Sequence, residues 1–129
     1  MRILVDTNTL LSALLFPRGT TAEAFDLLLQ RHRLVLCTYV INEAKTVVER
    51  KFPGYSRALS LFLNSLDFEV AYTPTDIEFD SSLMRDPKDV PILMTAIRED
   101  VDIILTGDKD FHALNLLGLT HGRTGRIRN

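Results

Sequence analysis

The chain has 129 residues, of which 46% are hydrophobic and 25% charged, and its formal net charge at pH 7 is −2. This length fits a single domain over residues 1–129, and the charge argues against a protein that holds nucleic acid by bulk electrostatics alone. No apolar run approaches the roughly 18 residues of a membrane span. Asp6 and Asn8 interrupt any N-terminal signal sequence, so we expect a cytoplasmic protein with no membrane partner.

The first half of the chain reads as two strands with helices after each. The strand-like aliphatic runs lie at residues 2–6 and 34–38, and helical patterns occupy residues 7–15, 21–31 and 40–52. Thr20 or Thr21 can cap the second of these helices, which follows the break FPRG. The apolar stripe of the third helix consists of Val40, Ala44, Val47 and Val48. The single cysteine, Cys37, excludes an internal disulfide and is most simply a small buried side chain.

The second half continues the alternation of helices and strands. A helix is expected at residues 56–66 and strands at 68–72 and 102–106, while residues 73–86 carry no clear pattern. Before the last strand lies a helix whose start is marked by Pro87 or Pro91. Its expected apolar face consists of Ile92, Leu93, Ala96 and Ile97. Strands that alternate with helices in this way predict a parallel α/β sheet.

Acidic residues stand at positions where their charge is hard to explain by solvation. Asp6 ends the first strand, and Asp108 follows the last one. Glu43 and Asp89 fall beside the apolar faces of their helices, where an unpaired carboxylate costs several kcal/mol. Helix capping could account for Asp6, Asp89 and Asp108 taken singly, but Glu43 lies on the wrong face for that role.

A common site explains the four acids together. In a doubly wound sheet, ligands bind outside the carboxyl ends of the strands where the strand order reverses. If the first and last strands flank that point, Asp6 and Asp108 become neighbours, and Glu43 and Asp89 can reach the same place from their helices. A set of oxygen ligands without His or Cys suits Mg²⁺ or Mn²⁺ and not structural zinc.

Four blocks of the sequence resemble, in order and spacing, the acidic motifs of PIN-domain proteins, in particular the group related to VapC-type toxins. The blocks are ILVDTNTLLSALL, YVINEAKTVVERKF, RDPKDVPILMTAI and DIILTGDKDF. The resemblance covers residues 1 to about 116. It implies a three-layer α/β/α sandwich with a parallel sheet of four or five strands, and a Mg²⁺- or Mn²⁺-dependent endoribonuclease, the toxin of a toxin–antitoxin pair.

By this resemblance Asp6, Glu43, Asp89 and Asp108 are the catalytic, metal-binding quartet. Asn8 and Thr106 match positions that support the acids, although turn or capping hydrogen bonds would explain them equally well. Asp86 is more simply an N-cap, and Asp110 either assists a second metal or, more simply, sits in a first helical turn. His121, in the last residues of the chain, is more simply a solvated terminal residue. The implied partners are an RNA substrate, an antitoxin protein and a second copy of the chain in a homodimer.

The chain departs from the family in its Gly- and Arg-rich end from about residue 117, so the fifth strand and any dimer surface stay undecided. Arg18 and the arginines of this end are candidate phosphate contacts, and residues 31–33 form another basic cluster.

Two other functions use the same sequence features. Haloacid-dehalogenase-like phosphatases also place an Asp after the first strand, but they need a second Asp where this chain has Asn8. A non-catalytic PIN-like binding module is the other alternative. The RNA target cannot be read from the sequence, because nothing in it encodes base contacts.

Overall fold

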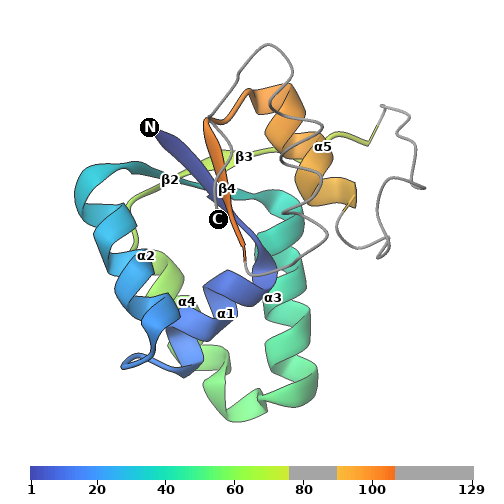
Figure 1. Ribbon diagram of the computed structural model, residues 1–129. Helices are drawn as coiled ribbons and strands as arrows, with labels where there is room; N and C mark the ends of the chain where they lie inside the picture. Colours follow the sequence, from blue (N-terminus) through green and yellow to red (C-terminus); the bar gives the residue numbers. More distant parts are fainter. Residues whose placement is uncertain (76–89, 107–129) are drawn as a thin grey trace.

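The computed structural model describes residues 1–75 and 90–106, and all structural statements below concern these two ranges. Within them the chain forms one four-stranded sheet in which every neighbouring pair is parallel (Figure 1). The strands are β1 (Arg2–Val5), β2 (Arg33–Cys37), β3 (Phe68–Ala71) and β4 (Ile103–Leu105). The predicted parallel α/β architecture is therefore confirmed, and each strand lies within two residues of its expected bounds.

Helices occupy the segments between the strands. They are α1 (Thr7–Leu15), α2 (Thr20–Arg31), α3 (Thr38–Lys51), α4 (Ser56–Ser65) and α5 (Val90–Glu99), with a 3₁₀ turn η1 (Pro53–Tyr55) before α4. The expected capping of α2 by Thr20 or Thr21 is wrong, because Thr20 is already helical and Gly19 occupies the N-cap without a side-chain hydrogen bond. Every helix described is too short or too polar to span a bilayer.

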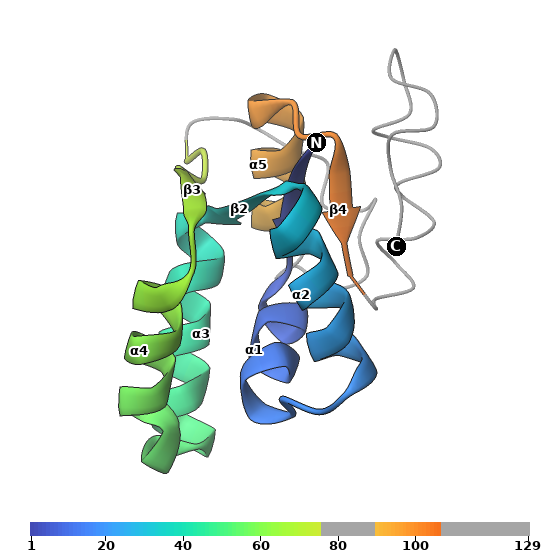
Figure 2. The ribbon, with the colours of Figure 1, turned by 90° about the vertical axis from the view of Figure 1, so that its left-hand side faces the viewer.

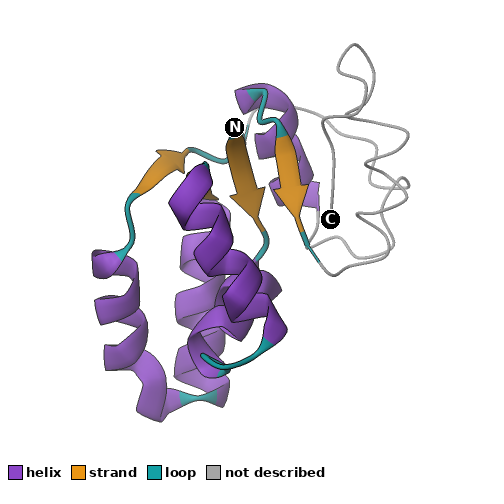
Figure 3. Ribbon diagram, turned by 60° about the vertical axis from the view of Figure 1, so that its left-hand side comes forward, coloured by secondary structure: helices purple, strands orange, loops and turns teal. Residues whose placement is uncertain are grey.

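The strand order β3-β2-β1-β4 creates a point at which the chain reverses direction across the sheet. From β1 the chain moves outward through β2 to β3, and it then crosses back to place β4 on the other side of β1. Figure 3 shows α2 in front of the strands and α5 behind them, so helices lie on both faces of the sheet. In Figure 2, α3 and α4 stand beside α1 and α2 below the sheet. The reversal point lies between β1 and β4, where this fold class binds its ligands.

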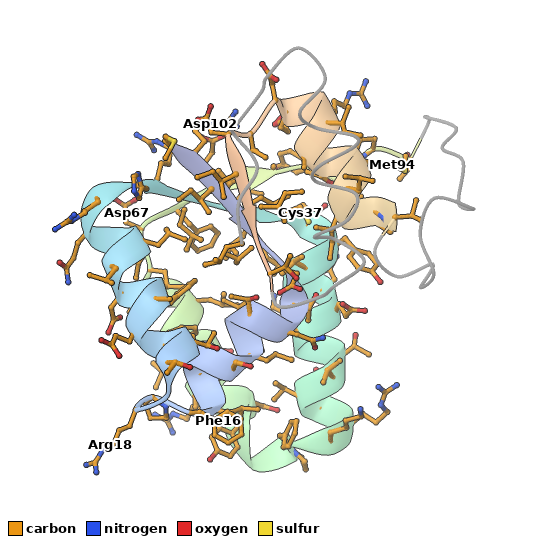
Figure 4. All side chains as sticks on the ribbon, viewed as in Figure 1. Phe16, Arg18, Cys37, Asp67, Met94 and Asp102 are labelled. Atoms are coloured by element: carbon orange, nitrogen blue, oxygen red, sulfur yellow. The ribbon has the colours of Figure 1, made fainter. Side chains whose placement is uncertain are left out.

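The core consists of the strands and the helix stripes that pack on them. Cys37 is a free thiol with no exposed surface, as expected, and Figure 4 places it inside the molecule where β2 meets α3. Phe25 of α2 packs against Phe62 of α4 with ring centroids 6.0 Å apart. The predicted stripe of α3 is confirmed, with Val47 at its half-buried margin.

The apolar face of α5 differs from the expected one at a single position. Ile92, Leu93 and Ala96 are buried, whereas Ile97 is 47% exposed. Thr95 has no exposed surface and takes the remaining buried position. At 3.6 residues per turn, the centre of the stripe lies near Ile92 and Ala96, so it extends to Thr95 on one side and leaves Ile97 outside.

Arg2 fastens the amino end of the sheet to three other elements. Its backbone N–H donates to Asp102 Oδ2 at 2.9 Å, just before β4, and its Nη1 donates to the Glu99 carbonyl of α5 at 2.6 Å. Its guanidinium also forms a salt bridge with Glu69 of β3. The hydrogen bond from Arg2 lowers the pKa of Glu69, and the same contact raises the pKa of Arg2.

Removing this salt bridge should make the protein less sensitive to acid. Because the pKa of Glu69 is lowered on folding, the stabilisation is complete above its ordinary value of 4.5 and is lost as the pH falls through the folded value. We expect Glu69→Gln to lower the free energy of unfolding at pH 7 by about 0.5–1 kcal/mol, a small loss because solvent screens a partly exposed pair. Urea unfolding of both proteins between pH 7 and pH 3 measures the difference, which should shrink toward acid.

Glu49, an exposed acid of α3, supplies the matched control. Glu49→Gln should leave both the stability at pH 7 and its pH dependence unchanged. A Glu69→Gln difference that persists undiminished at pH 3 would contradict the role of the ionised pair.

Candidate active site

Asp6 lies buried at the carboxyl end of β1, with 5% of its surface exposed. Its Oδ1 accepts a hydrogen bond from the backbone N–H of Thr9 at 2.7 Å, which makes Asp6 the N-cap of α1. Its Oδ2 accepts a hydrogen bond from the Thr106 hydroxyl. The capping role is therefore real, but an ionised carboxylate offers about four acceptor positions, and two of them remain for another ligand.

The pairing of β1 with β4 creates the contact between Asp6 and Thr106. Val5 lies opposite Leu105 in the parallel register, so the next residue of each strand reaches the same edge of the sheet. The Thr9 hydroxyl also lies 3.4 Å from the Leu105 carbonyl. The expected supporting role of Thr106 toward an acid is thus seen directly, whereas Asn8 is exposed on α1.

Glu43 reaches the carboxyl side of the sheet from α3, which starts where β2 ends. Its side chain is half-buried beside the apolar stripe, as the helical spacing predicted. The Tyr39 hydroxyl, one turn earlier on the helix, donates to Glu43 Oε2 at 3.0 Å. Since α1 packs against α3 and both follow adjacent strands, Asp6 and Glu43 lie on the same side of the sheet.

The hydrogen-bond partners of these two carboxylates in the described part of the chain are all neutral. They are a backbone amide and a hydroxyl for Asp6, and a phenol for Glu43. Glu69 at the opposite end of the sheet is instead neutralised by Arg2. Neutral donors fix the orientation of a carboxylate without cancelling its charge, so this edge can attract a cation.

Asp89 and Asp108 lie outside the described residues, as do Asp86, Asp110, His121 and the arginines near the end of the chain. Their convergence on Asp6 therefore stays a prediction. Residues 1–75 and 90–106 contain no group of three or more His, Cys, Asp or Glu side chains that could hold a metal ion. This is consistent with a quartet of which only Asp6 and Glu43 are described.

A buried hydroxyl on the residue after Asp6 has no partner within the described ranges. Thr7 Oγ1 is the only buried side-chain nitrogen or oxygen in the described ranges without a hydrogen bond, and Thr7 is 5% exposed. Because an unsatisfied buried polar group costs roughly 1–3 kcal/mol, such an atom next to a buried carboxylate indicates a missing polar neighbour. Sequence reasoning missed both Thr7 and Tyr39. The contact of Tyr39 with Glu43 could have been predicted, because residues four apart lie on the same face of a helix.

The described basic residues that the sequence suggested as phosphate contacts lie away from this edge. Arg31, His32 and Arg33 line an open cavity of about 500 Å³ at the amino end of β2. Arg18 follows the far end of α1, about 14 Å of helix from Asp6, and Figure 4 shows it pointing outward from the α1–α2 turn. Among the described residues, none of these is positioned to contact a phosphate that Asp6 and Glu43 would hold.

Comparison with known proteins identifies the family. The sequence matches the PIN domain over residues 2–110. The fold is similar to that of VapBC2 from Rickettsia felis, solved bound to a promoter DNA fragment, with 15% identity, coverage of 88% of this chain and 92% of that one, and a TM-score of 0.65.

VapC20 from Mycobacterium tuberculosis, a toxin that cleaves the sarcin–ricin loop, is also similar, with 16% identity, coverage of 86% and 93%, and a TM-score of 0.61. No curated protein sequence matches. The family match spans most of the chain, and the parallel sheet with its reversal between β1 and β4 agrees with it. The chain therefore belongs to the PIN domain family.

Proposed function

We propose that this protein is a Mg²⁺- or Mn²⁺-dependent endoribonuclease that hydrolyses RNA phosphodiester bonds as the toxin of a toxin–antitoxin pair. The observation that carries the proposal is the pair of carboxylates, Asp6 and Glu43, oriented by neutral donors on the carboxyl side of the sheet. Membership of the PIN domain family supports it. The similarity to VapC20, a toxin that cleaves the sarcin–ricin loop, points to the same activity.

The residues present fit a hard divalent cation. Asp6 and Glu43 would hold it together with Asp89 and Asp108, and all four supply oxygen ligands, as Mg²⁺ and Mn²⁺ prefer. The cysteine does not compete, because the Cys37 thiol is buried in the core. The buried Thr7 hydroxyl, which follows Asp6 in the sequence and has no partner among the described residues, supports a polar occupant near Asp6.

The protein's part in the reaction is placement. A bound divalent ion supplies an activated water and stabilises negative charge on phosphate oxygens. Thr106 and the Thr9 amide hold the Asp6 carboxylate in one orientation before substrate arrives, which reduces the reorganisation needed during the reaction. Tyr39 does the same for Glu43 from the neighbouring helix.

The partners are proposed from the family relationship. The VapBC2 structure is of a complex bound to a fragment of its promoter DNA, and we propose an antitoxin protein as a partner of this chain. We also propose a homodimer in the cytoplasm as the working form. A non-catalytic PIN-like module would bind partners without cleaving RNA. The haloacid-dehalogenase alternative gains no support, because the family match is to the PIN domain.

Replacing Asp6 by Asn should abolish metal-dependent cleavage. The variant loses a charged ligand, and the loss should exceed the 10–100-fold that outer partners of metal ligands typically contribute, so we expect at least a ~100-fold lower rate. A fluorogenic RNA assay with and without Mn²⁺, with chelator as a blank, measures it. Asp26→Asn, an exposed acid of α2, is the matched control and should cleave like the wild type. Full activity of Asp6→Asn would remove the proposal.

The capping role of Asp6 can be separated from its role toward a metal by stability measurements on metal-free protein. Asn is as good an N-cap as Asp and can still accept from the Thr9 amide, so Asp6→Asn should unfold within about 0.5 kcal/mol of the wild type. Asp6→Ala loses the cap and should cost about 1 kcal/mol or more. If Asn and Ala prove equally destabilising in urea, the capping account of this position is wrong.

A further inference from the structure

We infer that Tyr39 is a positioning residue, which fixes the Glu43 carboxylate and ties it to α5, the helix that follows Asp89 in the sequence. The inference rests on the proposed function, and it adds a residue that the acidic motifs do not include. Its basis is a continuous set of hydrogen bonds that starts at Glu43 and ends at the first turn of α5.

The first contact is between two side chains of α3. Tyr39 and Glu43 are four residues apart, so they lie on the same helix face, and the phenol donates to Glu43 Oε2 at 3.0 Å. Both side chains are half-buried. A partly buried phenol that donates to a carboxylate restricts its rotamers, while the other oxygen, Oε1, stays available as a ligand.

The backbone of Tyr39 is itself held from outside the helix. Its N–H donates to Thr73 Oγ1 at 3.1 Å, and the Thr73 N–H donates to Thr38 Oγ1 at 3.0 Å. These two bonds fasten the start of α3 to the segment that leaves β3. The first turn of a helix has free N–H groups, so an external acceptor at this point fixes how α3 begins.

The same threonine reaches α5. The hydroxyls of Thr73 and Thr95 lie 3.2 Å apart, and Thr95 Oγ1 also donates to the Pro91 carbonyl at 2.8 Å. Thr95 has no exposed surface, and both contacts are partly buried. The described part of α5 starts at Val90, the residue after Asp89 in the sequence, so the network joins α3 to α5.

Fixed geometry matters more for some ions than for others. Mg²⁺ demands near-ideal octahedral coordination, whereas Ca²⁺ accepts six to eight oxygens in flexible arrangements. Removing the phenol hydroxyl would loosen Glu43 without removing the ligand. A residue that only stabilises the fold would weaken both ions alike, but a residue that positions a ligand should favour Mg²⁺ over Ca²⁺.

The test is calorimetric titration of Mg²⁺, Mn²⁺ and Ca²⁺ into the full-length wild type, Tyr39→Phe and Tyr55→Phe. Tyr55 is an exposed tyrosine of η1, beyond the far end of α3, and serves as the matched control. We expect Tyr39→Phe to weaken Mg²⁺ and Mn²⁺ about tenfold, with a smaller effect on Ca²⁺ and an unchanged urea midpoint for the metal-free protein. Tyr55→Phe should match the wild type throughout.

Substitutions at Thr73 test the second half of the network. Thr73→Ser keeps the hydroxyl and should retain wild-type Mg²⁺ affinity, whereas Thr73→Val should weaken it. Equal Mg²⁺ affinity in Tyr39→Phe and wild type overturns the inference and leaves the proposed function standing. An equal loss for Mg²⁺ and Ca²⁺ overturns the positioning role, and a wild type that binds no divalent ion overturns both proposals.

Discussion

The parallel pairing of β1 with β4 is the constraint on which the site depends. It joins segments about a hundred residues apart in sequence, and the bond from Thr106 to Asp6 spans 100 positions. Because the register aligns Val5 with Leu105, both strands deliver their next residue to one edge of the sheet. There the buried Asp6 carboxylate accepts hydrogen bonds from the Thr9 amide and the Thr106 hydroxyl, and further acceptor positions remain for a ligand. A shift of one residue in this register would turn Asp6 to the other face of the sheet.

The acidic side chains at the two ends of the sheet have different kinds of hydrogen-bond partner. At the amino end, Glu69 is paired with Arg2, so its charge is neutralised within the fold and contributes to stability. At the carboxyl end, Asp6 and Glu43 receive only neutral donors among the residues that the structure describes. This contrast supports a cation site better than the number of acids does, because capping alone would not require carboxylates on Asp6 and Glu43 that have no charged partner in residues 1–75 and 90–106.

Most of the fold could be predicted from the sequence, because strands buried on both faces read as continuous aliphatic runs and the helices have clear apolar stripes. The bounds of α1 were predicted to the residue. Finer points depended on tertiary contacts. Thr95 was missed because it is polar, and its buried hydroxyl has partners in Thr73 and Pro91 that the sequence pattern does not reveal. From the sequence, Asp6 could be either a helix cap or a metal ligand. Its carboxylate accepts two hydrogen bonds and has further acceptor positions, so one residue can take both roles.

The central claim is that the carboxyl edge between β1 and β4 holds a divalent cation. Anomalous diffraction from crystals of the protein grown with Mn²⁺ tests it most directly. The account predicts a manganese peak roughly 2.0–2.3 Å from an Asp6 oxygen, with oxygens of Glu43, Asp89 or Asp108 completing its shell. Crystals at saturating Mn²⁺ with no peak at this edge, or with Asp89 and Asp108 turned to the far side of the molecule, would contradict it.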